Sequence, residues 1–163
     1  MSTPIVVLSL RPWHIYQLKK IFLRGLNTDF GYFPPDYIKA TKRQNSLLHF
    51  FSAWLNPKRL ILVAQTPSGE ITGFIIASII NSDECYIFWI YVSPKYRGKG
   101  IGKMLINKFL TESRDHQLKK IVLATHNMVD FYKKFNFTVR DDQTFVIEKV
   151  NMYIMEASVN EKN

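Results

Sequence analysis

One run of residues carries the clearest chemical signal in the sequence, Arg97-Gly98-Lys99-Gly100-Ile101-Gly102. It follows an apolar segment of strand character and precedes a segment with helical periodicity, which indicates a glycine-rich loop before a helix. Backbone N–H groups at a helix start lack intrahelical partners and carry partial positive charge, so they can hold a phosphate. The glycines keep side chains away from such a ligand, and Lys103 adds charge to that of Arg97 and Lys99. These residues therefore predict the binding of a phosphorylated ligand.

Spacing separates this loop from other phosphate-binding loops. A nucleoside triphosphate loop needs Gly-Lys followed by Ser or Thr, whereas Gly102-Lys103 is followed here by Met104. The dinucleotide-binding fingerprint requires a different spacing of glycines. A flexible surface turn is the simplest alternative, but the flanking strand and amphipathic helix favour a binding loop.

The loop resembles the acetyl-CoA loop of the GCN5-related N-acetyltransferase (GNAT) superfamily. That loop has Arg or Gln, two residues, Gly, one residue and then Gly or Ala, and Arg97, Gly100 and Gly102 occupy these positions. A second resemblance covers residues 130–137, Asp-Phe-Tyr-Lys-Lys-Phe-Asn-Phe, where family members usually end in Gly-Phe rather than Asn-Phe. The resemblance extends over about residues 60–156 and implies membership of this superfamily.

The resemblance implies an α+β fold, with a splayed, mixed and mostly antiparallel central sheet flanked by helices. Acetyl-CoA, the acyl donor, would lie between the strand ending at Val92 and the strand at 121–124, and no metal is expected. Main-chain groups near Ile90 and Val92 would pair with the pantetheine amides, and the pyrophosphate would sit on the loop. The residues expected to contact coenzyme A are Ile90, Tyr91, Val92, Arg97, Gly98, Lys99, Gly100, Ile101, Gly102, Lys103 and Asn127.

Tyr132 matches the tyrosine that the family uses as general acid. Transfer to an amine needs a group that protonates or hydrogen-bonds the departing thiolate. A helix start beside the parting strands would bring the Tyr132 hydroxyl close to the thioester sulfur. The alternative is that Tyr132 is a core ring at helical spacing.

The general base is assigned less directly. An amine with a pKa near 10 must lose a proton before it attacks. Histone-acetylating relatives carry a glutamate on the strand before the loop, at the position that Tyr86 occupies here. Glu84 is the leading candidate, because strict strand alternation would place it on the face of Tyr86, Phe88 and Ile90. Several alternatives stay open. Glu84 could be a solvated carboxylate at a hairpin end, a water relay could start from Glu84 or Tyr86, or the substrate could arrive already neutral. His126 could relay a proton or be merely structural.

Composition restricts the setting of this chemistry. The formal charge of +9 indicates an anionic ligand or partner, but the basic residues are spread along the chain rather than gathered in one tract. The single cysteine, Cys85, excludes an intramolecular disulfide and is expected to be a packed residue rather than a nucleophile. No signal peptide or membrane span is expected, and we predict a cytoplasmic protein.

The elements that must position these residues are predicted within one domain over residues 1–163. Residues 1–59 supply a strand and the acceptor-side helices, with a loop rich in aromatic rings over 27–36 that could line an acceptor pocket or plug the core. Residues 60–156 form the acetyl-CoA-binding core. Strands are expected at 5–10, 60–64, 71–80, 85–92, 121–124, 145–147 and 150–155, and helices around 15–22, 47–55, 101–117 and 128–135.

Three details of these elements are specific enough to check. The helix after the glycine loop should bury Ile101, Met104, Leu105 and Phe109 on one face. Asn127 should cap the helix over 128–135, and Asn136 should adopt the left-handed conformation after it.

Three functions are compared. The first is an N-acetyltransferase that passes the acetyl group of acetyl-CoA directly to a primary amine of a protein, a peptide or a small molecule. The second is a non-catalytic module that senses acyl-CoA, which is favoured by the presence of Tyr86 in place of glutamate. The third is a basic nucleic-acid-binding domain, which the charge and the 14% aromatic content suggest but which does not explain the glycine spacing. The expected partners are acetyl-CoA and an amine acceptor, and a homodimer stays open.

Overall fold

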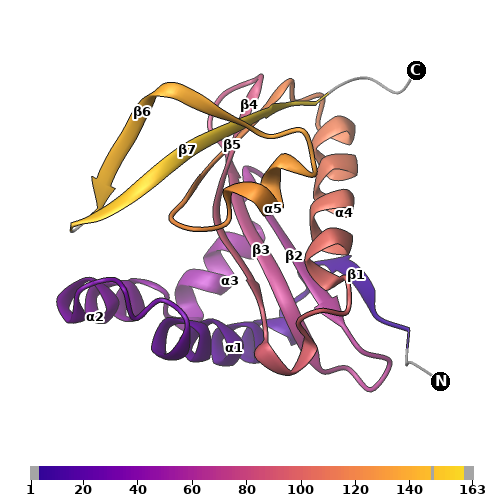
Figure 1. Cartoon of the computed structure of the whole chain (residues 1–163). Helices are drawn as coiled ribbons and strands as arrows, with labels where there is room; N and C mark the ends of the chain where they lie inside the picture. Colours follow the sequence, from indigo (N-terminus) through magenta and orange to yellow (C-terminus); the bar gives the residue numbers. More distant parts are fainter. Residues whose placement is uncertain (1–3, 148, 160–163) are drawn as a thin grey trace.

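A seven-stranded sheet is the centre of the structure, which is a computed structural model that describes residues 4–147 and 149–159 (Figure 1). The strand order is β1-β2-β3-β4-β5-β7-β6. The strands are β1 (Val6–Ser9), β2 (Arg59–Gln65), β3 (Ile71–Ile79), β4 (Glu84–Val92), β5 (Lys120–Thr125), β6 (Thr138–Ile147) and β7 (Val150–Ser158).

The sheet is mixed at one place, between β4 and β5. These two strands pair in parallel, whereas the other neighbouring strands pair antiparallel. The parallel register joins residues 84–87 to residues 120–123, and β4 then continues to Val92 without a further pairing to β5. The predicted mostly antiparallel, splayed sheet is therefore confirmed, and the two strands part after Ile87.

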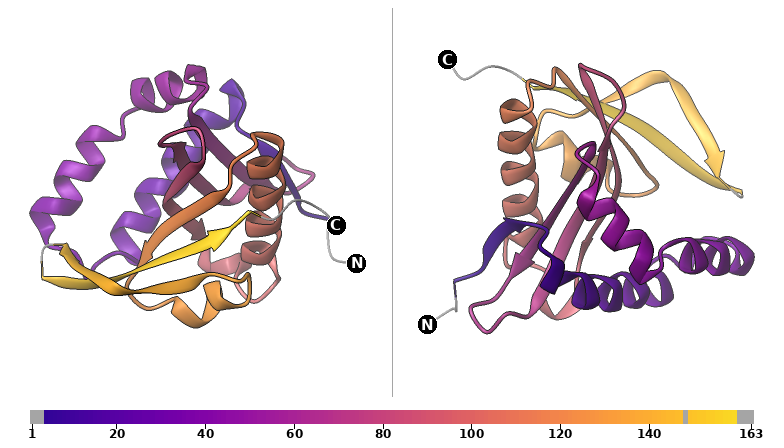
Figure 2. Two further views of the ribbon diagram at one scale, coloured as in Figure 1. Left: turned by 90° about the horizontal axis from the view of Figure 1, so that it is seen from above. Right: turned by 180° about the vertical axis from the view of Figure 1, so that it is seen from behind.

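Helices cover both faces of the sheet (Figure 2). The helical segments are η1 (Pro12–His14), α1 (Ile15–Thr28), α2 (Pro35–Gln44), α3 (Leu47–Leu55), η2 (Pro94–Tyr96), α4 (Ile101–Asp115) and α5 (Val129–Lys133). No helix among the described residues combines the length and the apolar composition needed to cross a bilayer.

Two hydrophobic cores lie on opposite faces of the sheet. On one face, the buried α4 residues Leu105 and Phe109 pack with Ile87 of β4. On the other face, Phe22 of α1 packs with Phe50 of α3 and with sheet residues such as Phe74. Burial of apolar side chains on both faces is the main stabilising term of such a layered fold and holds the parting ends of β4 and β5 in place.

A β-bulge in β4 changes which residues share a face. Ile76 of β3 pairs with Trp89, but the next residue pairs with Ile87, so Phe88 is the extra residue. Ile87 and Ile90 consequently belong to the core under α4, whereas Trp89 belongs to the core under α1. The prediction that Ile90 shares a face with Glu84 is therefore wrong, because it assumed unbroken alternation.

The predicted elements agree with the structure except at a few places, among them β6, which begins at Thr138 rather than at residue 145. Helix α2 was not predicted, because its only buried residue is Thr41 and its sequence has no apolar periodicity. In α4, Met104 is exposed and Ile106 takes the buried position. Helix α5 spans only five residues, and Asn136 has the expected positive φ of 62°.

Candidate functional site

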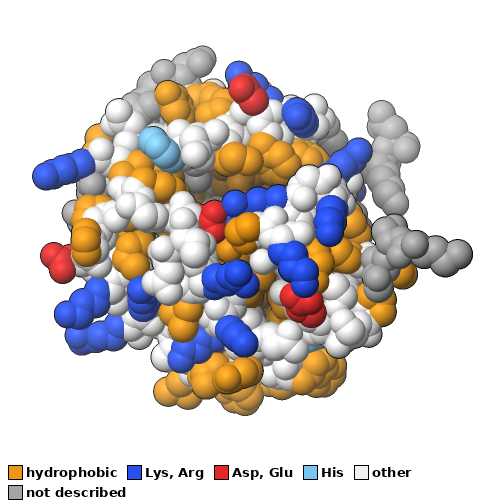
Figure 3. Space-filling model, turned by 60° about the horizontal axis from the view of Figure 1, so that its bottom comes forward, with side chains coloured by type: hydrophobic (Ala, Val, Ile, Leu, Met, Phe, Trp, Pro, Cys, Tyr) orange, Lys and Arg blue, Asp and Glu red, His pale blue; other side chains and the backbone are white. Residues whose placement is uncertain are grey.

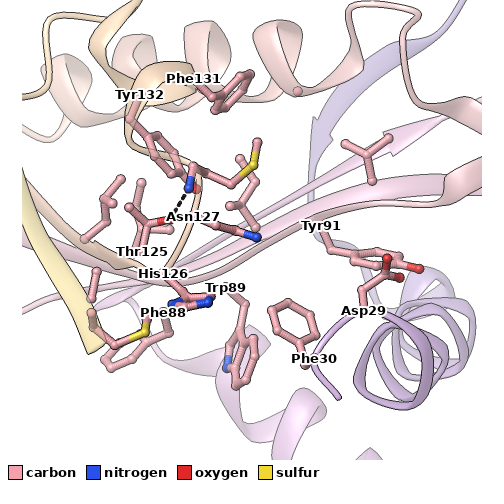
Figure 4. Close-up of a pocket in the computed structure, with 18 of the residues that line it drawn as sticks. Asp29, Phe30, Phe88, Trp89, Tyr91, Thr125, His126, Asn127, Phe131 and Tyr132 are labelled. Atoms are coloured by element: carbon pink, nitrogen blue, oxygen red, sulfur yellow. Dashed lines mark hydrogen bonds between the residues drawn. The ribbon is translucent and has the colours of Figure 1, made fainter. Parts of the chain in front are cut away.

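A cavity of about 830 Å³ opens where β4 and β5 part. The cavity is lined by the turn between α1 and α2, helix α2, the end of β4, the loop into α4 and the connection from β5 to α5, with Met152 added from β7. Figure 3 shows a hollow lined with hydrophobic side chains and bordered by Lys and Arg. In Figure 4, Phe30, Trp89 and His126 lie along one side of the cavity, Phe131 and Tyr132 along the other, and Asn127 between them.

The glycine loop forms the basic end of the cavity. Gly98 and Gly100 have φ angles of 75° and 77°, a region that L side chains rarely adopt, so the loop conformation requires glycine at both positions. A Cβ atom at either position would meet no atom within 4 Å, so both α-carbons face open space. The first intrahelical bond of α4 runs from the Met104 N–H to the Gly100 carbonyl, which leaves the earlier N–H groups of the helix for a ligand.

Arg97 ties this loop to the rest of the cavity wall. Its Nε donates to the Val92 carbonyl at 2.9 Å, and its Nη2 donates to Asp29 Oδ1 at 2.7 Å. Its guanidinium carbon lies 5.6 Å from the centre of the Tyr91 ring. The guanidinium therefore connects the end of β4 to the end of α1.

Asp29 is the partner of Arg97 that the sequence did not indicate. Burial of its carboxyl group pushes the pKa upward, but hydrogen bonds from Thr28 and Arg97 outweigh that effect and hold the pKa below its usual value. The buried Tyr91 hydroxyl lies beside this carboxylate and has no well-aligned hydrogen-bond partner among the described residues. Asp29 is thus ionised at neutral pH and fixes the direction of Arg97.

The two lysines predicted to contact the ligand differ in position. Lys103 lines the cavity, in the first turn of α4. Lys99 is not among the residues lining the cavity, and its ammonium lies 5.2 Å from the centre of the Tyr96 ring. The structure therefore brings Lys103, but not Lys99, to the candidate site.

Tyr132 lies in the wall of the cavity on α5. Its side chain is 4% exposed and packs edge-on against Phe131 and Phe137, with ring centres 5.2 and 5.8 Å away. Burial raises the pKa of Tyr132 far above its ordinary value, with a smaller contribution from Tyr32. The phenol therefore keeps its proton throughout the physiological pH range and can act as a hydrogen-bond donor.

The connection from β5 to α5 is held by Thr125 rather than by Asn127. The Met128 N–H donates to Thr125 Oγ1 at 3.1 Å, and the residue before the helix, Met128, makes no side-chain cap. The prediction that Asn127 caps this helix is wrong, because Thr125 satisfies the free N–H group instead. Asn127 lines the cavity, with its amide directed into it (Figure 4).

The structure does not bring Glu84 to the cavity. Glu84 pairs with Lys120 at the closed end of the β4–β5 ladder and is not among the residues that line the cavity, which follows β4 from Tyr86 onward. Tyr86, which stands where histone-acetylating relatives carry glutamate, does line the cavity, and burial raises its pKa. Glu84 therefore lacks contact with the cavity and is not proposed as the base.

Cys85 lies in the core beneath α4 rather than in the cavity. Its side chain is fully buried, and burial raises the pKa of its thiol to about 12. A thiol of this kind stays protonated at neutral pH and is a poor nucleophile. The prediction that Cys85 is a packed residue is confirmed.

His126 lies at the end of β5 and lines the cavity. Its Nδ1 is 3.1 Å from the carbonyl oxygen of Asn151 on β7. A carbonyl oxygen can only accept, so Nδ1 carries the proton and Nε2 of the neutral ring is left as an acceptor. Its ring centre is 5.0 Å from that of Tyr32.

Several residues of the cavity wall had no individual signal in the sequence. Trp89 enters the wall because of the bulge in β4, and Thr125 because of a local hydrogen bond. Asp29 contacts Arg97 across 68 positions of the chain. An aromatic loop was evident in the sequence, and the structure places Phe30 and Tyr32 of that loop in the cavity wall.

Comparisons with known proteins agree with this geometry. The structure resembles PaiA N-acetyltransferase from Thermoplasma acidophilum in complex with coenzyme A, with a TM-score of 0.79 and 23% identity over 95% of this chain and 99% of that one. It also resembles yncA from Salmonella typhimurium with its cofactor acetyl-CoA, with a TM-score of 0.74 and 15% identity over 99% and 97% of the two chains. At these identities the likeness shows the fold.

The sequence itself matches known proteins over shorter ranges. The uncharacterized N-acetyltransferase ycf52 of Pyropia yezoensis is 30% identical over 43% of this chain and 41% of its own length, so the matched part spans less than half of that curated relative. The model of the acetyltransferase (GNAT) family matches residues 22–137, which is more than half of the chain. The chain therefore belongs to the GNAT acetyltransferase family.

Proposed function

We propose that this protein transfers the acetyl group of acetyl-CoA directly to a primary amine. The observation that carries the proposal is the free helix start behind Gly98 and Gly100, which opens into the cavity between the parted strands. The Tyr132 hydroxyl in the wall of the same cavity adds a proton donor. Family membership and the bound ligands named for PaiA and yncA support the same donor.

In this proposal the two ends of coenzyme A use different parts of the wall. The pyrophosphate lies against the N–H groups at the start of α4, where Lys103 adds positive charge. The pantetheine arm extends along the edge of β4 beyond Ile87, which no longer pairs with β5. Main-chain groups of Ile90 and Val92 on that edge are the proposed partners of its amides, because an extended chain can add to a free strand edge.

Tyr132 is the proposed general acid. The amine nitrogen attacks the thioester carbonyl carbon, the carbon–sulfur bond breaks, and the electron pair stays on sulfur. A thiol has a pKa of about 8.5, below that of this buried phenol, so Tyr132 stabilises the thiolate mainly by donating a hydrogen bond. Its burial among Phe131 and Phe137 fixes the direction of that bond.

His126 is the proposed group that accepts the proton of the amine. Its Nδ1 proton is engaged by the Asn151 carbonyl, so Nε2 is the free acceptor of the ring. Among the lining residues that the structure describes, Asp29 is the only carboxylate, and it is paired with Arg97. His126 is therefore the proposed general base in place of Glu84.

Titration of the protein with acetyl-CoA, followed by isothermal calorimetry, tests the donor half of the proposal. We expect saturable binding, and no heat at millimolar acetyl-CoA would reject the proposal. Release of free thiol with a broad panel of amines then tests catalysis. Saturable binding without thiol release from any amine would replace the transferase by a module that senses acyl-CoA.

A further inference from the structure

Aromatic rings dominate the end of the cavity away from the glycine loop. The turn between α1 and α2 contributes Phe30 and Tyr32, and β4 contributes Tyr86, Phe88 and Trp89. The ring centres of Phe30 and Trp89 are 5.1 Å apart with perpendicular planes, and those of Tyr86 and Phe88 are 5.0 Å apart. These five residues are called the aromatic wall below.

The β-bulge is what makes the β4 part of this wall. In a regular strand, Phe88 and Trp89 would point to opposite faces of the sheet. Because Phe88 is the extra residue, Tyr86, Phe88 and Trp89 all contribute to the lining of one cavity. The bulge therefore concentrates rings at the place where β4 leaves β5.

The turn between α1 and α2 covers this end of the cavity. Phe33 is buried against Val150 and Met152 of β7, and Tyr37 packs on Phe33 with ring centres 4.6 Å apart. Tyr32 extends the cover to the β5–α5 connection through its contact with His126. The turn is therefore held at two places, against β7 and against the β5–α5 connection.

Charge separates the two ends of the cavity. Asp29, the only carboxylate among the described lining residues, lies beside Arg97 at the glycine loop and is ion-paired with it. The five residues of the aromatic wall are uncharged, and Arg59, whose guanidinium carbon lies 5.4 Å from the centre of the Phe88 ring, is not among the lining residues. A second ammonium group of a diamine, or the charged side chains of a peptide, would lose water there without gaining an ionic partner.

We propose that the acceptor is a small primary amine carried on an aromatic ring, which the aromatic wall holds by ring stacking. The inference rests on the proposed transferase function and names its acceptor class. The acceptor ring lies between Tyr32 and the rings of β4, and the amine points toward His126 and the thioester. The flat ring and the single charge both match the chemistry of this wall.

The same wall assists the removal of the amine proton. An ammonium group that enters an apolar site loses hydration, which lowers the pKa of the amine. Nε2 of His126 takes the first proton of the ammonium, and the neutral nitrogen then attacks the thioester carbonyl carbon. The carbon–sulfur bond breaks with its electron pair on sulfur, and the second proton lost from the nitrogen ends on the thiolate, which gives free coenzyme A thiol. No carboxylate is required near the amine, because His126 accepts its proton.

Binding to the protein saturated with coenzyme A tests the inference without any turnover. Isothermal calorimetry compares phenethylamine and tryptamine with hexylamine, putrescine and a short lysine peptide. We expect the two aromatic amines to bind about five- to tenfold more tightly than hexylamine, since one stacked ring pair contributes up to about that factor. Equal binding of hexylamine, or preferred binding of putrescine or the peptide, would overturn the inference.

Substitutions at Tyr32 identify the wall as the source of the preference. Tyr32→Ala removes a ring that is 38% exposed and should reduce the preference for phenethylamine over hexylamine by about fivefold, whereas Tyr32→Phe should keep it. Tyr16→Ala is the matched control, because Tyr16 is 69% exposed on α1 and does not line the cavity. An unchanged preference in Tyr32→Ala would contradict the placement of the acceptor ring.

The outcomes for the acceptor and for the proposed function are separate. Lack of acetyl-CoA binding, or of thiol release with any amine, would reject the transferase. Thiol release with putrescine or the peptide as the best substrate would retain the transferase and reject the aromatic acceptor. Selective binding of aromatic amines to the complex with coenzyme A supports the inference, whatever the rate of turnover.

Discussion

The two ends of the cavity are built from different parts of the polypeptide. The glycine-loop end presents main-chain N–H groups at the start of α4, with Gly98 and Gly100 in a conformation that removes side chains from the site. The aromatic end presents side chains from the α1–α2 turn and from a bulged strand. A main-chain site suits a donor that is common to a family, whereas a side-chain site can change with the acceptor.

Arg97 and Asp29 join these two ends. Arg97 belongs to the glycine loop, and Asp29 follows α1 where the acceptor-side turn begins. Tyr132 and His126 line the same cavity, and in the proposed function acetyl transfer takes place beside them. Changes in each part should therefore affect donor affinity, acceptor affinity and turnover differently.

The largest expected effect is on turnover, in Tyr132→Phe. The substitution removes the hydroxyl that would stabilise the thiolate but keeps the buried ring, so kcat should fall by about 100-fold. The Kd for acetyl-CoA should stay about the same, within roughly twofold, because the phenol does not contact the pyrophosphate in the proposed complex. Steady-state thiol release and calorimetry measure the two quantities.

Tyr16→Phe is the control for the effect of Tyr132→Phe. It removes an exposed hydroxyl outside the cavity and should leave kcat and the Kd for acetyl-CoA unchanged. If Tyr132→Phe turns over at the wild-type rate, Tyr132 is a core ring and not the acid.

The donor end was largely predictable from the sequence. The loop from Arg97 to Gly102 has a spacing that few other sites share, because backbone conformation and phosphate size restrict where glycine must stand. The strand before it and the helix after it followed from hydrophobic periodicity. The mixed, mostly antiparallel sheet followed from the family resemblance, and the parallel pairing of β4 with β5 agrees with that expectation.

The acceptor end was predicted less well, for physical reasons. Helix α2 has almost no buried side chains, so its stability comes from context rather than from a pattern in its sequence. The bulge at Phe88 shifts the faces of β4 by one residue, and strict alternation therefore misplaced Ile90. Glu84 was favoured on the same alternation, although it lies at the closed end of the ladder.

The next largest effect concerns donor affinity, in Gly100→Val. A β-branched residue at a φ of 77° is strained by about 1–2 kcal/mol, and its side chain would point into the open space where the pyrophosphate would lie. The Kd for acetyl-CoA should rise at least about tenfold, which calorimetry measures. Binding of the aromatic amine should change less than binding of acetyl-CoA, since the amine contacts the other end.

Gly69→Val provides the matched control for backbone strain. Gly69 has a φ of 87° in the turn between β2 and β3 and does not line the cavity. Both variants should lose stability to a similar degree in denaturant unfolding, but only Gly100→Val should lose affinity for acetyl-CoA. An equal loss of affinity in the two variants would mean that strain acts through global stability rather than at the loop.

The smallest effect is expected where the two ends meet, in Asp29→Asn. The Asp29–Arg97 pair is partly exposed, with 24% and 47% of the two side chains accessible, so its loss should cost at most about 1 kcal/mol of unfolding free energy at pH 7. Affinity for acetyl-CoA should rise by about two- to threefold, because one negative charge near the pyrophosphate is removed. Opposite signs for stability and donor affinity would identify Asp29 as a structural link rather than a ligand contact.

The pH dependence of this difference follows from the lowered pKa of Asp29. A carboxyl group whose pKa is lower in the folded state stabilises the fold above its unfolded pKa of about 3.9 and loses that contribution as the pH falls through the folded value. The stability difference between the wild type and Asp29→Asn should therefore be constant from pH 7 to pH 5 and shrink below about pH 4.

Urea unfolding at pH 7, 5, 4 and 3 measures this stability difference. Arg97→Lys is a second variant, which keeps the positive charge but lacks the planar guanidinium that reaches both Val92 and Asp29. A difference that persists at pH 3 would show that the amide disturbs the turn by itself, and the link between the two ends would then not depend on the charge of Asp29.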